Sequence, residues 1–212
     1  MTIGKVQICN MALSRVGAGR IEALTEKSAE AVECNTLYDH ARLETLEAYD
    51  WNFARKRLAL SEHSEDPPDG VWGFRYQYPV DCVRARYMEN PTVVHQSIVR
   101  GVPTQLVEPD AIPFMVEMDD DGITKSILTD LDDATLVYTF DQKDTNAFSR
   151  TFITALAYQL GSYMAFALTG KLNLEERLNF LARLTVQNAA ANNHNENVPR
   201  APRESEFIRG RW

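Results

Sequence analysis

The sequence predicts an α+β fold: a four-helix bundle core of two N-terminal and two C-terminal helices, a central antiparallel β-rich insertion, and an extended C-terminal tail. Three observations lead to this prediction. Helical periodicity occupies both ends of the chain, short β-branched and aromatic segments occupy its middle, and the last stretch is polar and contains prolines. We therefore expect bundle halves at residues 1–54 and 148–192, the insertion at 55–147 and the tail at 193–212.

Two helices are expected in the N-terminal half. Apolar side chains recur at helical spacing from Val6 to Val16 and predict a helix over residues 3–16, which Gly17 ends. Ser28 is a favourable N-cap for a second helix over residues 29–50, because neither Gly nor Pro interrupts that stretch.

The third helix is expected in "TFITALAYQLGSYMAFALTGK", which has no charged residue between Arg150 and Lys171. A stretch of this length could cross a bilayer, which needs roughly 17–25 apolar residues. Gln159 near its centre would be unfavourable against lipid. Ala157, Gly161 and Ala165 form a ridge of small residues at spacing four, along which another backbone can approach closely. We therefore expect a soluble protein without membrane contact, and a buried helix partly covered by other subunits.

A fourth helix is expected in "LNLEERLNFLARLTVQNAA", with Asn173 as its N-cap and Glu176 completing a capping box. Between the helical ends, short segments with strand character alternate with breakers, as in an antiparallel β-rich insertion. They are "WGFRYQYPVD", "PTVVHQSIV", "PTQLVE", "PFMVEM", "ITKSILT" and "ATLVYTF".

The negative charge is concentrated in one segment. The 212 residues carry a formal net charge of −8, and residues 106–144 contain 11 acidic and 2 basic residues, so the rest of the chain carries +1. Non-specific binding of nucleic acid depends on Lys and Arg displacing counterions. An acidic protein is therefore a poor non-specific ligand for DNA or RNA.

No motif predicts an enzyme, a metal site or a cofactor site. "EMDDDGITKSIL" matches the start of a calcium loop, but Leu128 stands where a bidentate glutamate is required, so we expect a hairpin turn around Asp120, Asp121 and Gly122. The three cysteines are widely spaced and are expected to be buried free thiols. The N-terminus has no apolar run typical of a signal peptide, so we expect synthesis in a cytoplasm.

Two alternative functions stay open. One is a cytoplasmic enzyme of unknown chemistry, whose scattered residues only folding would bring together. The other is a single-stranded nucleic-acid-binding protein, because basic and aromatic residues are close in sequence as on a stacking platform. These residues are Arg55, Lys56, Arg57, Arg75, Arg84 and Arg86 with Phe74, Tyr76 and Tyr78. A strand edge with solvated arginines and aromatic core residues explains them more simply.

Five segments together resemble the tail tubular protein A group, the head-to-tail adaptors of short-tailed bacteriophages. They are "ICNMALSRVGAGRIEALTE", "AYDWNFARKRLAL", "YQYPVDCVRARYM", "LTDLDDATLVYTF" and "ALAYQLGSYMAFALTGK". The resemblance runs from about Val6 to Trp212 and contains no catalytic motif. It implies a helical bundle carrying a β-rich portion, a dodecameric ring of identical subunits in the virion tail, and contacts with the portal protein and the tail nozzle protein.

In such a ring, DNA passes through the channel without sequence-specific binding, and an acidic protein suits that role. We expect subunit or portal contacts at the small ridge of Ala157, Gly161 and Ala165. We expect further contacts at the tail, where large apolar side chains and arginines occur in a stretch too short to form its own core. The tail residues are Phe207, Ile208, Arg209 and Trp212.

Overall fold

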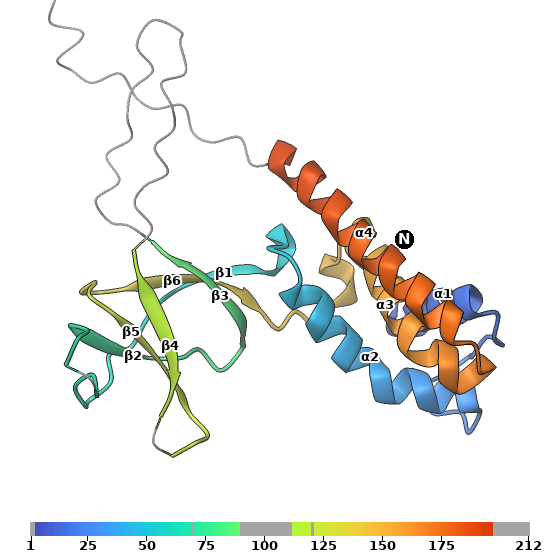
Figure 1. The fold of residues 1–212 in the computed structure, drawn as a ribbon, viewed down its shortest axis with the longest axis horizontal. Helices are drawn as coiled ribbons and strands as arrows, with labels where there is room; N and C mark the ends of the chain where they lie inside the picture. Colours follow the sequence, from blue (N-terminus) through green and yellow to red (C-terminus); the bar gives the residue numbers. More distant parts are fainter. Residues whose placement is uncertain (1–2, 69, 90–111, 120, 197–212) are drawn as a thin grey trace, which may run out of the picture. The chain divides into compact units, whose positions relative to one another are not determined.

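The chain is a mixed α and β protein with four helices and two small antiparallel sheets (Figure 1). The computed structural model describes residues 3–68, 70–89, 112–119 and 121–196. These residues divide into two compact units. Residues 3–55 and 139–196 form the helical unit, and residues 56–68, 70–89, 112–119 and 121–138 form the β unit.

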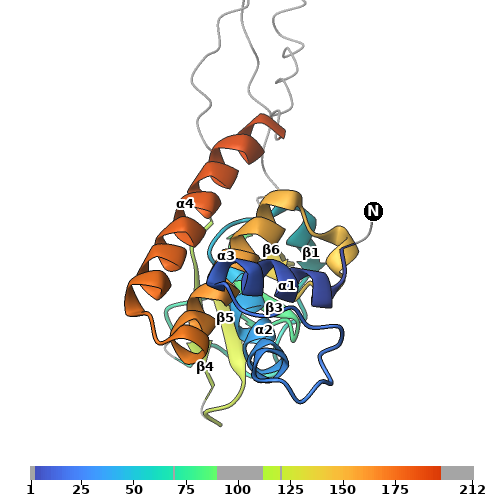
Figure 2. The same ribbon diagram turned by 90° about the vertical axis from the view of Figure 1, so that its right-hand side faces the viewer.

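In the helical unit, helix α3 packs against each of the other three helices. The helices are α1 (Lys5–Val16), α2 (Ala29–Glu47), α3 (Arg150–Thr169) and α4 (Leu172–Glu196), with short 3-10 helices at Asn52–Ala54 and Thr145–Ala147. Helix α4 runs back along α3, and α1 and α2 pack on α3 as well (Figures 1 and 2). Most apolar side chains of α3 are therefore covered by three partners from the same chain, whereas Phe166 is 52% exposed.

Local sequence explains where these helices begin and end. Ser28 is the N-cap of α2, as predicted, and its Oγ accepts a hydrogen bond from the Ala31 N–H at 3.3 Å. Ser149 caps α3 in the same way, accepting from the Phe152 N–H at 3.2 Å. Gly17 and Gly170 end α1 and α3 in the left-handed conformation, with φ of 81° and 68°, which glycine adopts without strain.

Four predicted helix boundaries were wrong. Helix α1 begins at Lys5 and not at residue 3, with Gly4 as its N-cap. Helix α2 ends at Glu47 and not at residue 50, because the indole N–H of Trp51 donates to the Thr45 carbonyl at 2.8 Å as the chain turns away. Asn173 is not an N-cap, since the Lys171 carbonyl already accepts from the Leu174 N–H at 3.2 Å. Helix α4 continues to Glu196, so residues 193–196 are helical and not part of a tail. No Gly or Pro interrupts that stretch.

The small ridge on α3 is buried inside the subunit. Ala157 and Ala165 have no exposed surface, and Gly161 is buried as well. A Cβ atom at Gly161 would lie 3.4 Å from the Ala12 carbonyl oxygen of α1 and 3.5 Å from Leu178 Cδ1 of α4. The prediction of close backbone approach is thus confirmed. The prediction that these three residues contact another subunit or the portal is corrected, because α1 and α4 already cover them.

The β unit holds most of the two sheets. The strands are β1 (Arg55–Ala59), β2 (Phe74–Gln77), β3 (Cys82–Met88), β4 (Phe114–Met118), β5 (Lys125–Thr129) and β6 (Thr135–Phe140). One sheet has the order β1-β6-β3 and the other the order β2-β5-β4. Strands β2, β4, β5 and β6 fall in segments predicted to have strand character. Strands β1 and β3 were not singled out in advance.

The predicted hairpin turn joins β4 to β5. The strands pair antiparallel with Met118 opposite Lys125, and Gly122 takes a φ of 66° in the turn. The Asp121 carboxylate accepts hydrogen bonds from the N–H groups of Ile123 and Thr124 at 2.8 and 2.7 Å, which fixes the turn locally. The segments "PTVVHQSIV" and "PTQLVE" lie outside the described residues.

Replacing Gly161 with leucine should destabilise the helical unit by about 1–3 kcal/mol, because the new side chain would push α1 and α4 away from α3. Chemical denaturation followed by far-ultraviolet circular dichroism measures the change.

Ala167→Leu is the matched control, since Ala167 is exposed on the same helix and should tolerate leucine within about 0.5 kcal/mol. Equal stability of Gly161→Leu and Ala167→Leu would show that the close approach at Gly161 does not constrain the packing.

Candidate assembly and binding surfaces

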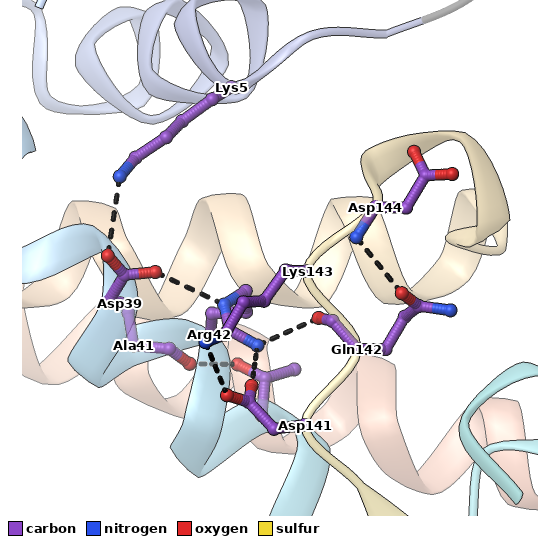
Figure 3. A network of polar contacts seen from close by, with 9 residues as sticks. Lys5, Asp39, Ala41, Arg42, Asp141, Gln142, Lys143 and Asp144 are labelled. Atoms are coloured by element: carbon purple, nitrogen blue, oxygen red, sulfur yellow. Dashed lines mark hydrogen bonds and ion pairs between the residues drawn. The ribbon is translucent and has the colours of Figure 1, made fainter. Parts of the chain in front are cut away.

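A buried arginine connects α2 to the chain that follows β6. Arg42 has a side chain that is only 3% exposed, and its Nη1 atom lies 2.5 Å from Asp141 Oδ1. The same Nη1 donates to the Gln142 carbonyl at 2.7 Å, and Nε donates to Asp39 at 3.3 Å (Figure 3). Both segments belong to the helical unit. Arg42 therefore fixes the start of the 141–149 connection, which leads into α3, against the side of α2.

Further charges extend this cluster at its edges. Lys5 of α1 lies 3.4 Å from Asp39, and Lys143 lies 3.3 Å from Asp141 (Figure 3). Burial raises the pKa of Asp39, but the positive charge of Lys5 and the hydrogen bond from Arg42 outweigh it, so this pKa is lowered overall. The Lys5–Asp39 and Lys143–Asp141 pairs are at the solvent-exposed edge and contribute little to the free energy of unfolding. The guanidinium group of Arg42 is desolvated, so its burial is tolerated only with its ionic and hydrogen-bond partners in place.

The polar residue in the middle of α3 also has a partner inside the chain. Gln159 is buried, and its amide nitrogen donates to Glu44 of α2 at 3.1 Å. Tyr163, one turn further along α3, donates its hydroxyl proton to the same carboxylate. Gln159 thus joins α3 to α2, and this hydrogen bond explains how a polar side chain is accommodated in the middle of an apolar helix.

A cleft of about 290 Å³ lies beside this contact, between α2, α3 and α4. Its wall includes Glu44, Gln159, Arg183 and Gln187 with small residues such as Ala155 and Ala182. The lining contains no cysteine, serine or histidine, and its hydroxyl group, that of Thr45, donates to the Ala41 carbonyl at 2.7 Å.

By length and composition, helix α3 could cross a membrane. However, 61% of its 18-residue apolar stretch is buried by the rest of the chain. A core helix of a soluble protein meets the same criterion, and the burial of α3 against α1, α2 and α4 explains its composition without lipid.

The acidic hairpin uses its carboxylates within the protein. Asp119 accepts a hydrogen bond from the Ser126 hydroxyl and pairs with Arg75 at 2.9 Å. These contacts, the Ser126 hydrogen bond first, lower the pKa of Asp119. The Asp121 carboxylate accepts hydrogen bonds from the Thr124 hydroxyl and from the N–H groups of Thr124 and Ile123, and these bonds lower the pKa of Asp121. Over the described residues, no group of three His, Cys, Asp or Glu side chains is placed to hold a metal ion.

The residues considered for nucleic-acid binding do not form one open platform. Arg75 is held between Asp119 and Glu65, the latter at 3.2 Å, and its side chain is 11% exposed. Tyr76 is buried and donates to the Leu131 carbonyl at 2.9 Å. These two side chains stabilise the sheet and are not available for stacking on bases. The arginines of β1 and β3 lie on the other sheet.

The thiols match their prediction in part. Cys9, Cys34 and Cys82 are free; Cys9 and Cys34 are buried, while Cys82 is half-buried. Cys34 Sγ lies 3.6 Å from the Met164 sulfur in the core of the helical unit. The predicted tail contacts at Phe207, Ile208, Arg209 and Trp212 lie outside the described residues.

Neither the comparison with models of known protein families nor the comparison with curated proteins finds a match.

The sequence reasoning missed Arg42 and Glu44 of α2, whose side chains bond to the segment after β6 and to α3. Their signal was weak, because a charged residue on a long helix is normally solvated. Arg42 falls at helical spacing from the buried residues Tyr38 and Thr45, which places it on the inner face of α2. That spacing was the available clue.

Removing the carboxylate of Asp141 should destabilise the helical unit by roughly 2–3 kcal/mol, because the buried Arg42 charge would keep only Asp39 as an ionic partner. Urea unfolding of Asp141→Ala measures this.

Lys143→Ala is the control, since it removes only the exposed partner of Asp141 and should change stability by less than about 0.5 kcal/mol. Arg42→Met should cost less than Asp141→Ala because it strands no buried charge. The opposite order would contradict this account of the cluster.

Acidification should weaken the β unit through Asp119. Its pKa is lowered in the folded protein, so the stabilisation is present above the unfolded value of about 3.9 and is lost as the pH falls through the folded pKa. The unfolding free energy of the wild type should therefore fall more steeply below about pH 4 than that of Asp119→Asn. Parallel curves for the two proteins would show that Asp119 does not contribute to the pH dependence.

Proposed function

We propose that this chain is a structural subunit of a phage virion: the head-to-tail adaptor that joins the portal to the tail nozzle of a short-tailed bacteriophage. In this role identical subunits form a ring, a dodecamer by resemblance, and the ring forms part of the DNA channel. Each subunit is made in the host cytoplasm and acts as a non-enzymatic, cofactor-free component. Its partners are other copies of itself, the portal protein and the nozzle protein, and no membrane is involved.

The observation that supports this proposal is the series of segments that resemble the adaptor family. They fall on α1, on the stretch after α2 together with β1, on β2 and β3, on β6 and on α3. They therefore include α1, which packs on α3, as well as strands of both sheets. A resemblance spread over such different elements is typical of a shared fold and not of one shared motif.

We also propose that the four helices are the bundle core of each subunit and that the β-rich part is an insertion into it. The central position of α3, in contact with α1, α2 and α4, is consistent with such a core. The insertion would begin after α2 and end before α3, which is where the β unit occurs in the chain.

The distribution of acidic residues fits a channel component. Exposed carboxylates occur on β4 and in the turns beside β5, at Glu117, Asp121, Asp130, Asp132 and Asp133. Negative side chains repel the DNA backbone, so DNA could pass such a surface without being retained.

The purified protein tests this function directly. We expect native mass spectrometry and negative-stain microscopy to show rings, either from the protein alone or after mixing with the portal ring of the same virus. A protein that stays monomeric and does not bind the portal would contradict the proposal.

Deleting residues 204–212 tests the predicted tail contact. We expect a folded subunit with normal helical content that no longer joins the ring or the portal, because losing an aromatic anchor often costs at least ~2 kcal/mol of binding. Normal assembly of the truncated protein would show that the tail is dispensable. Unfolding would show instead that the tail belongs to the subunit core.

A further inference from the structure

Two strands of the β unit differ from the other four in being exposed on both faces. All five residues of β1 are exposed, as are the last four residues of β4, whereas each of the other strands has at least one buried residue. Both are edge strands, since the sheet orders are β1-β6-β3 and β2-β5-β4. Edge strands with apolar surface are sites where another chain can add to a sheet.

The two edges of the second sheet differ within the described part of the chain. The connection after β1 covers β2, because the His63 N–H donates to the Arg75 carbonyl at 2.8 Å and the Gln77 N–H donates to the Ser61 carbonyl at 2.9 Å. Among the described residues, no strand pairs with the outer edge of β4. That edge has no lysine or proline within the strand, and it exposes Met115, Val116 and Met118 by 39%, 39% and 50%.

The register shows which backbone groups of β4 face outward. The Asp119 N–H donates to the Thr124 carbonyl at 2.8 Å. In this register the backbone N–H and C=O groups of every second residue, at positions 119, 117 and 115, face β5 and form hydrogen bonds with it. Phe114, Val116 and Met118 therefore direct their N–H and C=O groups away from β5. A strand placed beside β4 could form main-chain hydrogen bonds with these outward N–H and C=O groups.

The two exposed strands are complementary in charge. Strand β1 contains Arg55, Lys56 and Arg57 and exposes Leu58 by 42%. Strand β4 contains Glu117 and leads into the aspartates of its turn. Lys56 and Arg57 have ion-pair partners in the subunit at 2.7 and 3.3 Å, but both pairs are solvent-exposed and can rearrange at little cost.

We propose that β4 of one copy of this chain pairs with β1 of a second copy, extending the sheet across the boundary between subunits. The contact joins two different surfaces, so each subunit can bind one neighbour through β1 and another through β4. Such a heterologous contact closes into a ring when the rotation between copies permits it. The main-chain hydrogen bonds would supply affinity, and the opposite charges would favour β1 over a second β4.

This inference deepens the proposed function by naming its subunit contact, but its evidence is independent of any phage role. A self-assembling protein with another task would show the same contact.

Cysteine cross-linking tests the pairing. Leu58→Cys and Val116→Cys would be made as separate proteins of different mass, both with Cys82→Ser, then mixed and oxidised. We expect the mixed 58–116 dimer to exceed each like-with-like dimer several-fold. Predominant 116–116 dimers would show a symmetric contact and would overturn the proposal, as would the absence of any cross-link between copies that have assembled.

Val116→Pro removes one outward N–H and no hydrogen bond to β5, and prolines are tolerated at such edge positions. We expect at least about fivefold weaker self-association by sedimentation, with circular dichroism and melting temperature nearly unchanged. Val116→Thr keeps the N–H and should associate almost as the wild type does. Equal association of the proline and threonine variants would overturn the proposal.

Charge provides a further test that does not alter the backbone. Glu117→Lys makes β4 basic like β1 and should weaken association more than Glu117→Gln, with a difference that salt reduces. No difference at low salt would count against β1 as the partner.

The outcomes separate this inference from the proposed function. Rings that bind the portal without 58–116 cross-links would retain the function and remove the pairing. Cross-links without rings or portal binding would retain the pairing and remove the function. A protein that is monomeric under all these conditions, with β4 inaccessible to cross-linking, would overturn both.

Discussion

The absence of charge on α3 is the constraint on which the helical unit depends. No ionised side chain occurs between Arg150 and Lys171, so in water this helix is stable only when other segments cover it on most sides. Helices α1, α2 and α4 provide that cover. The glycine at position 161 allows α1 to approach, because a larger side chain would meet the Ala12 carbonyl. Aromatic rings complete the cover at the start of α3, where Phe152 meets Trp51, Phe53 and Phe148 at centroid distances of 4.7 to 5.1 Å.

Polar contacts then determine which arrangement of these helices forms. Apolar packing alone is tolerant of small shifts in register, whereas a buried charge or amide costs free energy unless its partner is in place. Gln159 requires Glu44 of α2, and Arg42 of α2 requires Asp141 ahead of α3. Both requirements connect α2 to the C-terminal part of the chain. The two contacts therefore define how the N-terminal and C-terminal helices meet within the helical unit.

The sequence predicted the helices at both ends and the β-rich middle of the described chain, because those elements depend on local pattern. Ser28, Gly17 and Gly122 act within a few residues of themselves, so their roles could be predicted without knowing the fold. Strand β1 was missed because three basic residues in succession show no alternation, although β3 does alternate small or apolar residues with Arg84 and Arg86. Arg42 and Glu44 were missed because their partners are 99 and 115 residues away, and no periodicity indicates such a pairing. The small ridge was recognised, but only the structure could show that its partners belong to the same chain.

The contrast between the helices and the edge strands supports the proposed contact between copies of this chain. The small ridge, the feature with the clearest packing character, is fully used within the subunit and leaves little for a neighbour. The exposed strands β1 and β4 have the opposite character, since most of their side chains are exposed and, within the described residues, no strand of either sheet lies beyond them. Main-chain pairing is also less sensitive to side-chain identity than core packing is, because the backbone provides the hydrogen bonds. A subunit built in this way can keep its own fold before assembly and still join its neighbours through strands, so folding and assembly depend on different parts of the sequence.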